Sequence, residues 1–239
     1  MVKMNPSSNK VPKHVCIVLD GNRRFSKKLM MKPWKGHEFG AEKVKKLLEW
    51  SIELGIKELT LYTFSYENLN RPKKELDYLM DLFKKEFDNV INDKSIDENE
   101  IMINFIGRLN VFPQDVQERM HKIMEKTKNY DKFIVNFAMG YGGRVEIIDA
   151  VRKIGEKIKE GKLDVKDINE GTFKDNLYLK DDADLIIRTG GEKRTSGFLP
   201  WQGTYAELIF LDKLWPEFEK EDFLHCIEEF KNRKRRFGK

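Results

Sequence analysis

The stretch that decides the fold reads His14-Val-Cys-Ile-Val-Leu-Asp-Gly-Asn-Arg-Arg24. Residues 14–19 form a short, mostly apolar run, which is typical of a buried strand. A carboxylate, a glycine, an amide and two guanidiniums follow at once, and a tight turn there would feed a helix whose positive end suits an anion. Arg23 and Arg24 could bind phosphate, and Asp20 could hold a metal ion or a polar substrate group. An ordinary Asp-Gly turn with a solvated basic face is the competing interpretation.

Short apolar runs alternate with amphipathic segments along the rest of the chain. Several runs are apolar at every position, as in parallel strands that are covered on both faces. The segments between them repeat apolar residues at helical spacing, as Ile147, Val151, Ile154 and Ile158 do. The alternation predicts one α/β domain over residues 13–239, preceded by a flexible segment at residues 1–12. The predicted strands are residues 15–19, 59–64, 101–106, 133–138, 185–187 and 208–211.

Composition limits the class of protein. The chain has 239 residues, of which 40% are hydrophobic and 36% charged, as in a soluble globular domain. A net charge of +5 is too small to indicate a nucleic-acid partner. Cys16 and Cys226 lack CxxC spacing, so we expect free thiols in a reducing, cytoplasmic setting. No apolar run is long enough to span a membrane, and residues 1–12 lack the apolar core of a secretory signal.

Polar and glycine-rich clusters follow the predicted strands, which is where ligands collect in a parallel α/β sheet. Besides residues 20–24, these clusters are residues 65–71, 140–144 and 188–194. Arg188 and Arg194 flank two glycines, with Ser196 beyond them, so guanidiniums, a hydroxyl and accessible backbone could hold a diphosphate. Any one cluster could be a charged surface loop, but their convergence on one rim of the sheet predicts a site.

Several separated motifs resemble the cis-prenyltransferases, the family of undecaprenyl-diphosphate and dehydrodolichyl-diphosphate synthases. The resemblance runs from about His14 to Gly238 and is closest to the eukaryotic and archaeal branch, because Arg23 and Phe25 stand where bacterial relatives usually carry Gly and Trp. The motifs include Asp20-Gly-Asn-Arg-Arg-Phe25, Tyr62-Thr-Phe-Ser-Tyr-Glu-Asn-Leu-Asn-Arg-Pro72, and Arg188-Thr-Gly-Gly-Glu-Lys-Arg-Thr-Ser-Gly-Phe-Leu-Pro-Trp-Gln-Gly-Thr-Tyr-Ala-Glu-Leu208.

The resemblance implies a six-stranded, mostly parallel sheet flanked by helices, with one hydrophobic tunnel, and a homodimer. It implies that isopentenyl diphosphate units are added to an allylic diphosphate, farnesyl or geranylgeranyl diphosphate, to make a cis-polyprenyl diphosphate with Mg²⁺ as cofactor. A short-chain cis-prenyl product is the alternative within the class. The trans-type synthases are all-helical and carry two Asp-Asp-x-x-Asp motifs, whereas this chain has only Asp181-Asp-Ala-Asp184, which we interpret as a solvated loop.

Each matching residue receives a role from the resemblance. Asp20 would act with Mg²⁺ on the diphosphates, and Glu207 would be a metal ligand, in its own site or in that of the partner subunit. Asn68 would assist proton removal, although a neutral amide is a poor base and diphosphate itself could take the proton. The substrate-binding matches are Gly21, Asn22, Arg23, Arg24, Phe25, His37, Ser65, Tyr66, Glu67, Leu69, Arg71, Arg188, Arg194, Thr195 and Ser196. Lys32 or Lys35 would replace an arginine of the relatives.

The C-terminal Arg236 and Gly238 match a family motif that reaches across the dimer to the partner's diphosphate loop. A frayed basic terminus is the competing interpretation, and the motif match favours the functional one. The basic terminus could also bring the enzyme to anionic lipid, because a long polyprenyl product is insoluble in water. A non-catalytic partner subunit is the alternative to an enzyme. The presence of Asp20, Asn68, the arginines and Glu207 favours the enzyme.

Bulky apolar residues at helical spacing would line the tunnel. Leu76, Leu79, Met80, Phe83 and Phe87 share one helix face, which is either ordinary core or in part a tunnel wall. We expect Phe105, Phe133 and Phe137 to close the tunnel floor and limit the length of the product.

Overall fold

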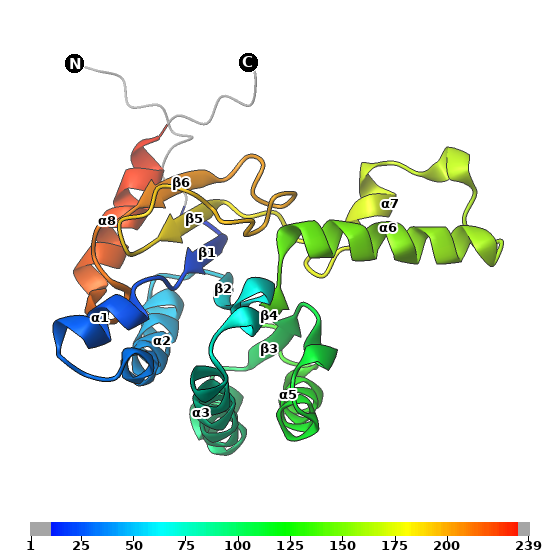
Figure 1. Cartoon of the computed structure of the whole chain (residues 1–239). Helices are drawn as coiled ribbons and strands as arrows, with labels where there is room; N and C mark the ends of the chain where they lie inside the picture. The colour runs from blue at the N-terminus through cyan, green and yellow to red at the C-terminus, as the bar shows by residue number, and fades with distance from the viewer. Residues whose placement is uncertain (1–10, 234–239) are drawn as a thin grey trace, which may run out of the picture.

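Six parallel strands form one sheet in the order β3-β4-β2-β1-β5-β6 (Figure 1). The computed structural model describes residues 11–233, and every neighbouring pair of strands in it is parallel. This confirms the predicted α/β class and the strand order along the chain, although β4 continues to Tyr141 instead of ending at residue 138. The strands are β1 His14–Val18, β2 Glu58–Ser65, β3 Ile101–Ile106, β4 Phe133–Tyr141, β5 Leu185–Arg188 and β6 Glu207–Phe210.

Helices and short helical turns connect the strands. The α-helices are α1 Asn22–Lys28, α2 Gly36–Glu53, α3 Lys73–Asn92, α4 Lys94–Glu98, α5 Gln114–Thr127, α6 Gly143–Lys159, α7 Glu170–Lys174 and α8 Lys220–Asn232. Tighter helical turns lie at η1 Pro33–Lys35, η2 Tyr66–Asn70, η3 Leu109–Val111, η4 Val165–Asp167 and η5 Trp215–Glu217.

The main hydrophobic core lies between one face of the sheet and the helices α2, α3, α5 and α8. Each helix contributes a side chain that is almost fully buried: Leu47, Leu79, Met120 and Phe223. A smaller cluster that includes Leu179 and Phe198 covers the other face. Figure 1 shows that α6 leaves the end of β4 and projects from the body, with α7 beside it.

The sheet places three loops around the end of β1. This strand lies between β2 and β5, so the chain extends from it in both directions along the sheet. Val18, at the end of β1, is in register with Tyr62 of β2 and Arg188 of β5. In parallel sheets a crevice opens where the strand order changes direction in this way, outside the carboxyl ends of the strands. The loops after β1, β2 and β5 therefore face a common space.

Candidate active site

Asp20 lies just beyond β1 between two guanidiniums. Its Oδ1 is 3.0 Å from Nη2 of Arg24, and its Oδ2 accepts a 2.9 Å hydrogen bond from Nη2 of Arg188. Arg188 is only 5% exposed, and its Nη1 donates to the hydroxyl of Ser196 at 2.8 Å and to the carbonyl of Arg194 at 2.6 Å. Its Nε is buried with no partner among the described residues, so this guanidinium keeps a donor for a ligand.

Two glycines let the loops after β1 and β5 meet. Gly21 has φ +117°, and a Cβ there would lie 2.9 Å from the backbone of Leu214. Gly190 has φ +88°, and a Cβ there would lie 2.5 Å from Nη2 of Arg24. The carbonyl of Gly190 accepts a 2.6 Å hydrogen bond from Arg24, and the hydroxyl of Thr189 donates to the carbonyl of Asp20 at 2.8 Å. The two loops are therefore locked together with their charged groups already placed.

Two arginines and a histidine surround the buried carboxylate of Glu75 at the start of α3. Arg71 donates to Glu75 at 3.0 Å, and Nε of Arg23 and Nε2 of His37 lie 3.7 and 3.9 Å from the same oxygen. Burial, together with the positive charges of Arg71 and Arg23, lowers the pKa of His37 to about 3. His37 is therefore neutral near pH 7, and its ring can accept or donate a single hydrogen bond.

Asn68 is held by the turn that follows β2. Its Oδ1 accepts the backbone N–H of Ser65 at 3.1 Å, and the two residues cap the short helical turn Tyr66–Asn70 reciprocally. The amide oxygen is thus used by the fold, while the amide NH₂ remains a donor. This geometry does not suit a proton acceptor, in line with the weak basicity expected of an amide.

Side chains around Asp20, the basic side chains around Glu75, and Asn68 line one polar cavity of about 740 Å³. The guanidiniums of Arg23, Arg24, Arg71 and Arg188 outnumber the lining carboxylates of Asp20 and Glu67, so the cavity favours a polyanion. The remaining predicted residues in its lining are Gly21, Asn22, His37, Ser65, Asn68 and Ser196.

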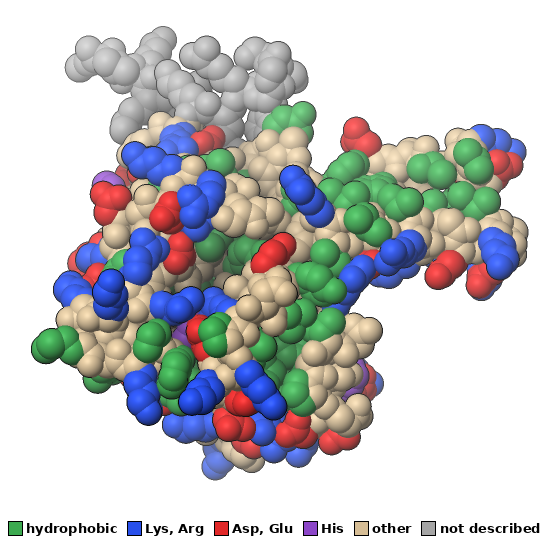
Figure 2. All heavy atoms as spheres, in the orientation of Figure 1, with side chains coloured by type: hydrophobic (Ala, Val, Ile, Leu, Met, Phe, Trp, Pro, Cys, Tyr) green, Lys and Arg blue, Asp and Glu red, His purple; other side chains and the backbone are tan. Residues whose placement is uncertain are grey.

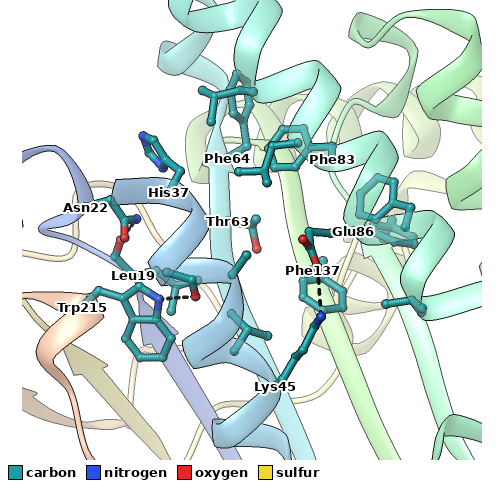
Figure 3. A pocket seen from close by; sticks show the side chains of 18 of the residues that line it. Leu19, Asn22, His37, Lys45, Thr63, Phe64, Phe83, Glu86, Phe137 and Trp215 are labelled. Atoms are coloured by element: carbon teal, nitrogen blue, oxygen red, sulfur yellow. Dashed lines mark hydrogen bonds and ion pairs between the residues drawn. The ribbon is translucent and has the colours of Figure 1, made fainter. Parts of the chain in front are cut away.

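A second, apolar cavity of about 130 Å³ lies between α2, α3 and the sheet. Figure 3 shows His37 and Asn22 at one end of it, and Phe137 near the ion pair of Lys45 with Glu86 at the other. Phe83 also lies in its wall. The two cavities adjoin, because they share Leu19, Asn22, His37, Thr63 and Arg71. A cavity lined by charged groups therefore lies directly beside an apolar one.

Comparisons with known proteins agree with this geometry. Residues 18–238 match the family model described as "Putative undecaprenyl diphosphate synthase". The chain belongs to this family of cis-prenyltransferases. The geranylgeranyl-diphosphate-specific tritrans,polycis-undecaprenyl-diphosphate synthase of Methanopyrus kandleri is 47% identical over 232 residues, which are 96% of this chain and 86% of that relative. The synthase of the same name from Methanocaldococcus jannaschii is also 47% identical, over 96% of this chain and 83% of its own length.

Solved structures of the family have the same fold. Lavandulyl diphosphate synthase from Lavandula x intermedia, in complex with dimethylallyl diphosphate, superposes with a TM-score of 0.91 at 32% identity and covers 96% of this chain and 99% of its own. An undecaprenyl diphosphate synthase from Campylobacter jejuni, described as probable, gives a TM-score of 0.80 at 37% identity and covers 97% and 100%.

Some residues that match cis-prenyltransferase motifs lie outside the polar cavity. Phe25 packs against Phe39, with ring centroids 5.3 Å apart, and the ring of Tyr66 lies 5.3 Å from the guanidinium of Arg108. Leu69 packs on the main core. The side chain of Arg194 pairs with Glu192, so only its backbone contacts Arg188. The residues concerned are Phe25, Tyr66, Leu69, Arg194 and Thr195, while Arg236 and Gly238 lie outside the described residues.

Glu207 is far from Asp20 along the sheet. It begins β6 and is in register with Leu185, at the amino ends of the strands, whereas Asp20 follows the carboxyl end of β1. Its Oε2 accepts a 2.8 Å hydrogen bond from Arg233. Within one chain, Glu207 and Asp20 therefore do not face the same cavity.

The remaining sequence features have local roles. Lys35 pairs with Glu38, and neither Lys32 nor Lys35 lines the polar cavity. In the cluster at residues 140–144, the N–H of Gly143 donates to the carbonyl of Gly197, which supports the loop after β5 rather than lining the cavity. Asp184, part of the acidic run before β5, accepts the backbone N–H groups of Lys13 and His14.

The family is generally Mg²⁺-dependent, and the polar cavity fits that ion. Mg²⁺ in proteins is often held by one or two carboxylates together with substrate phosphates. The side chain of Asp20 is 30% exposed and lines the cavity, so it can supply one oxygen. The described residues contain no group of three or more potential ligands, so the other oxygens would come from substrate and water.

Glu75 is the residue that sequence reasoning missed. It is 2% exposed and draws Arg23, Arg71 and His37 together. In the sequence, Glu75 could have been found as a charged residue one helical turn before the buried Leu79 and four positions after Arg71.

Among residues 11–233, no helix is both long and apolar enough to cross a membrane.

Proposed function

We propose that this protein is a cis-polyprenyl diphosphate synthase that condenses isopentenyl diphosphate units onto geranylgeranyl diphosphate. The observation that carries the proposal is that an arginine-lined cavity and an apolar cavity adjoin and share five lining residues. An allylic diphosphate has a polyanionic head and an apolar tail, and it needs both chambers. The archaeal relatives, at 47% identity, are specific for geranylgeranyl diphosphate, which favours that primer over farnesyl diphosphate.

The charged chamber would drive the first step, in which the allylic C–O bond breaks and its electron pair leaves with diphosphate. Arg23, Arg24 and Arg71 would hold that diphosphate and stabilise its growing charge. Arg188 and Ser196 would hold the second substrate, isopentenyl diphosphate, with the buried Nε of Arg188 completing the contact. Asp20 keeps Arg24 and Arg188 in position for the two anions.

The isopentenyl double bond would then attack the allylic carbon and form the new C–C bond. The resulting cation loses a proton to form the cis double bond. Because Oδ1 of Asn68 already accepts the Ser65 N–H, we assign the proton to the departing diphosphate and assign Asn68 the donation of its NH₂ to substrate oxygen. His37, neutral near pH 7, would donate or accept one further hydrogen bond.

Mg²⁺, when bound, neutralises diphosphate charge and makes diphosphate a better leaving group. Asp20 would hold it together with diphosphate oxygens. Glu207 would serve as a ligand only from the partner subunit, because its own chain places it at the opposite end of the strands. A homodimer is therefore part of the proposal, with Arg236 and Gly238 as further contributions across the interface.

The product tail would grow into the apolar cavity as a tunnel between α2 and α3. A cavity of about 130 Å³ is smaller than the 300–1,000 Å³ of typical ligand pockets, so the helices must separate as the tail lengthens. We expect the enzyme to act in the cytoplasm with peripheral membrane contact for release of its product. The two buried free thiols, Cys16 and Cys226, support a reducing setting.

Incubation with labelled isopentenyl diphosphate, Mg²⁺ and either geranylgeranyl or farnesyl diphosphate tests the proposal. We expect chain elongation, faster with geranylgeranyl diphosphate, and no elongation when Mg²⁺ is chelated. The Asp20→Ala variant serves as the inactive control. Absence of elongation with every allylic primer would overturn the enzymatic function and favour a non-catalytic subunit.

A short-chain product is the alternative function, and the small volume of the apolar cavity favours it. The same assay separates the two, because chromatography of the dephosphorylated products gives their length. Products that stop after one or a few additions would replace the long-chain proposal.

A further inference from the structure

The connection between α1 and α2 carries an exposed apolar tip. Leu29, Met30 and Met31 are consecutive, and they are 44%, 95% and 43% exposed. Single exposed apolar side chains are common on protein surfaces, but a contiguous group marks an interaction site more often. Figure 2 shows hydrophobic side chains at this tip, at the left edge of the molecule, with Lys and Arg side chains nearby.

The tip is ordered by hydrogen bonds of its own backbone. The N–H of Met30 donates to the carbonyl of Lys27 at 3.1 Å, and the N–H of Met31 donates to that of Ser26 at 2.9 Å. The buried hydroxyl of Ser26 also donates to the carbonyl of Pro33 at 3.0 Å, which closes the base of the loop. Met30 has φ +54°, where glycine or asparagine is usual, yet the chain keeps a long apolar side chain there.

Positive charge and an aromatic ring surround the tip. Lys27, Lys28 and Lys32 are exposed, and Lys27 and Lys32 have no carboxylate partner in the described part of the chain. The ammonium of Lys32 lies 5.9 Å from the ring of Trp34, which itself packs against Tyr78 of α3. An apolar tip with a lysine rim and an interfacial tryptophan has the chemistry of a segment that enters the headgroup layer of an anionic bilayer.

The tip is too small to favour a protein partner. Stable protein interfaces bury about 800 Å² on each side, far more than three side chains can provide. A bilayer needs no such area, because apolar insertion and attraction of lysine to anionic lipid act together. The opposite end of α1, only seven residues or about 10 Å away, carries Asn22, Arg23 and Arg24 of the polar cavity. Docking here would place the site against the membrane.

We propose that Leu29, Met30 and Met31, with Lys27 and Lys32, form the surface that docks this protein on anionic membranes. The inference rests on the proposed function, because it gives the water-insoluble product of that reaction a direct route to the bilayer. It requires no change in the chemistry of the site.

Sedimentation with vesicles tests the docking surface. The full chain is mixed with vesicles of phosphatidylcholine and phosphatidylglycerol, or of phosphatidylcholine alone. We expect binding to the mixed vesicles, reduced about tenfold or more in Leu29→Ser/Met30→Ser/Met31→Ser. Lys27→Gln and Lys32→Gln should each weaken binding about fivefold on mixed vesicles only. Leu224→Ser removes another exposed apolar side chain, on α8, and should bind like the unaltered chain.

Insertion is measured separately with Met30→Trp and brominated phosphatidylcholine in the mixed vesicles. We expect quenching of the added tryptophan fluorescence beyond that of the unaltered chain, and no added quenching for Leu224→Trp. Binding of the triple serine variant equal to that of the unaltered chain, or no binding of the unaltered chain to anionic vesicles, would overturn the inference. Elongation in detergent is measured alongside, so that an active enzyme without membrane binding contradicts only this inference.

Discussion

At the residue scale, Asp20 shows how a common turn motif becomes a specific site. An Asp-Gly pair after a strand is compatible with an ordinary turn. The structure instead places the carboxylate between Arg24 of α1 and Arg188 at the end of β5, which are separated by most of the chain. The convergence was predictable because the carboxyl ends of parallel strands meet at one rim. Which guanidinium pairs with each carboxylate oxygen of Asp20 depends on side-chain geometry, and the sequence pattern does not contain that geometry.

We predict that Asp20→Asn leaves the fold intact and removes most of the activity. The amide keeps the shape of the side chain but loses the charge that positions two guanidiniums and could bind Mg²⁺. We expect kcat/KM to fall at least about a hundredfold, as for loss of a main electrostatic group in an active site. Thermal unfolding should stay within a few degrees of the unaltered protein. Activity near the normal level would remove Asp20 from the proposed mechanism.

Glu75 was not recognised from the sequence, because a glutamate in the first turn of a helix is usually explained by the helix dipole. Its burial and its three basic neighbours, Arg23, Arg71 and the neutral His37, became evident only when η2, α1 and α2 were placed around it. In Glu75→Gln, the oxygen that Arg71 contacts would remain but the charge would be lost.

We predict that Glu75→Gln raises KM for the allylic diphosphate more than it lowers kcat, because Arg23 and Arg71 would repel each other and leave their positions. Steady-state kinetics at saturating isopentenyl diphosphate measure this. Asp88→Asn is the matched control, since Asp88 lies on the same helix as Glu75, pairs with Arg119 of α5 and lines neither cavity. An equal loss in both variants would indicate a structural effect.

His37 should make the free protein sensitive to acid. The unfolded chain binds a proton at His37 near pH 6.5, whereas the folded chain, whose His37 has a pKa of about 3, does not. Stability is therefore lost as pH falls below about 6.5, by up to about 1.4 kcal/mol per pH unit. We predict that His37→Gln reduces this slope between pH 6 and pH 4 in urea unfolding experiments. Parallel slopes for the two proteins would contradict a neutral, partly buried His37.

At the element scale, the sequence predicted the six strands well, because their apolar runs are short and separated by amphipathic segments. The extension of β4 to Tyr141 was missed, since Gly140 suggested an end to the strand. Glu207 directly precedes the predicted strand at residues 208–211, and its register with Leu185 places it at the amino ends of the strands. The cavity between α2 and α3 was beyond prediction in detail, because helical periodicity does not distinguish a tunnel wall from a core.

The three phenylalanines expected at the tunnel floor now separate into two kinds. Phe105 and Phe137 line the apolar cavity and stack with centroids 5.6 Å apart, whereas Phe133 is buried in the core and does not line it. The earlier expectation for Phe133 is therefore wrong in this structure. Its position at the start of β4, four residues before Phe137, explains why the two rings differ in surroundings.

We predict that Phe137→Ala lengthens the product, because it removes a ring from the cavity wall. Phe133→Ala is the matched control and should destabilise the protein by about 3–5 kcal/mol without changing product length. Product chromatography and urea unfolding of both variants measure the two effects. An unchanged product from Phe137→Ala in a folded protein would exclude Phe137 as a determinant of length.

At the scale of the whole molecule, α6 stands out because the rest of the described chain leaves part of its apolar surface uncovered. It projects from the body (Figure 1), and Ile148 and Val151 on it are 50% and 56% exposed. The helical spacing of its apolar residues was predicted from the sequence, but the side left uncovered was not, because spacing does not say what covers a face. Its first turn holds the loop after β5 through the bond of Gly143 to Gly197. A partner subunit seated on α6 would thus act close to the isopentenyl diphosphate loop.

We predict that Ile148→Glu/Val151→Glu converts the proposed homodimer into monomers and lowers activity at least about tenfold. Two buried, unpaired carboxylates are incompatible with an apolar interface. Loss of the partner would also remove the contributions proposed for its Glu207, Arg236 and Gly238 equivalents. Sedimentation velocity and elongation assays at the same protein concentration measure both effects, and Leu224→Glu on α8 controls for added surface charge. Dimers that persist in the double variant would exclude α6 as the interface, and fully active monomers would show that each chain contains a complete site.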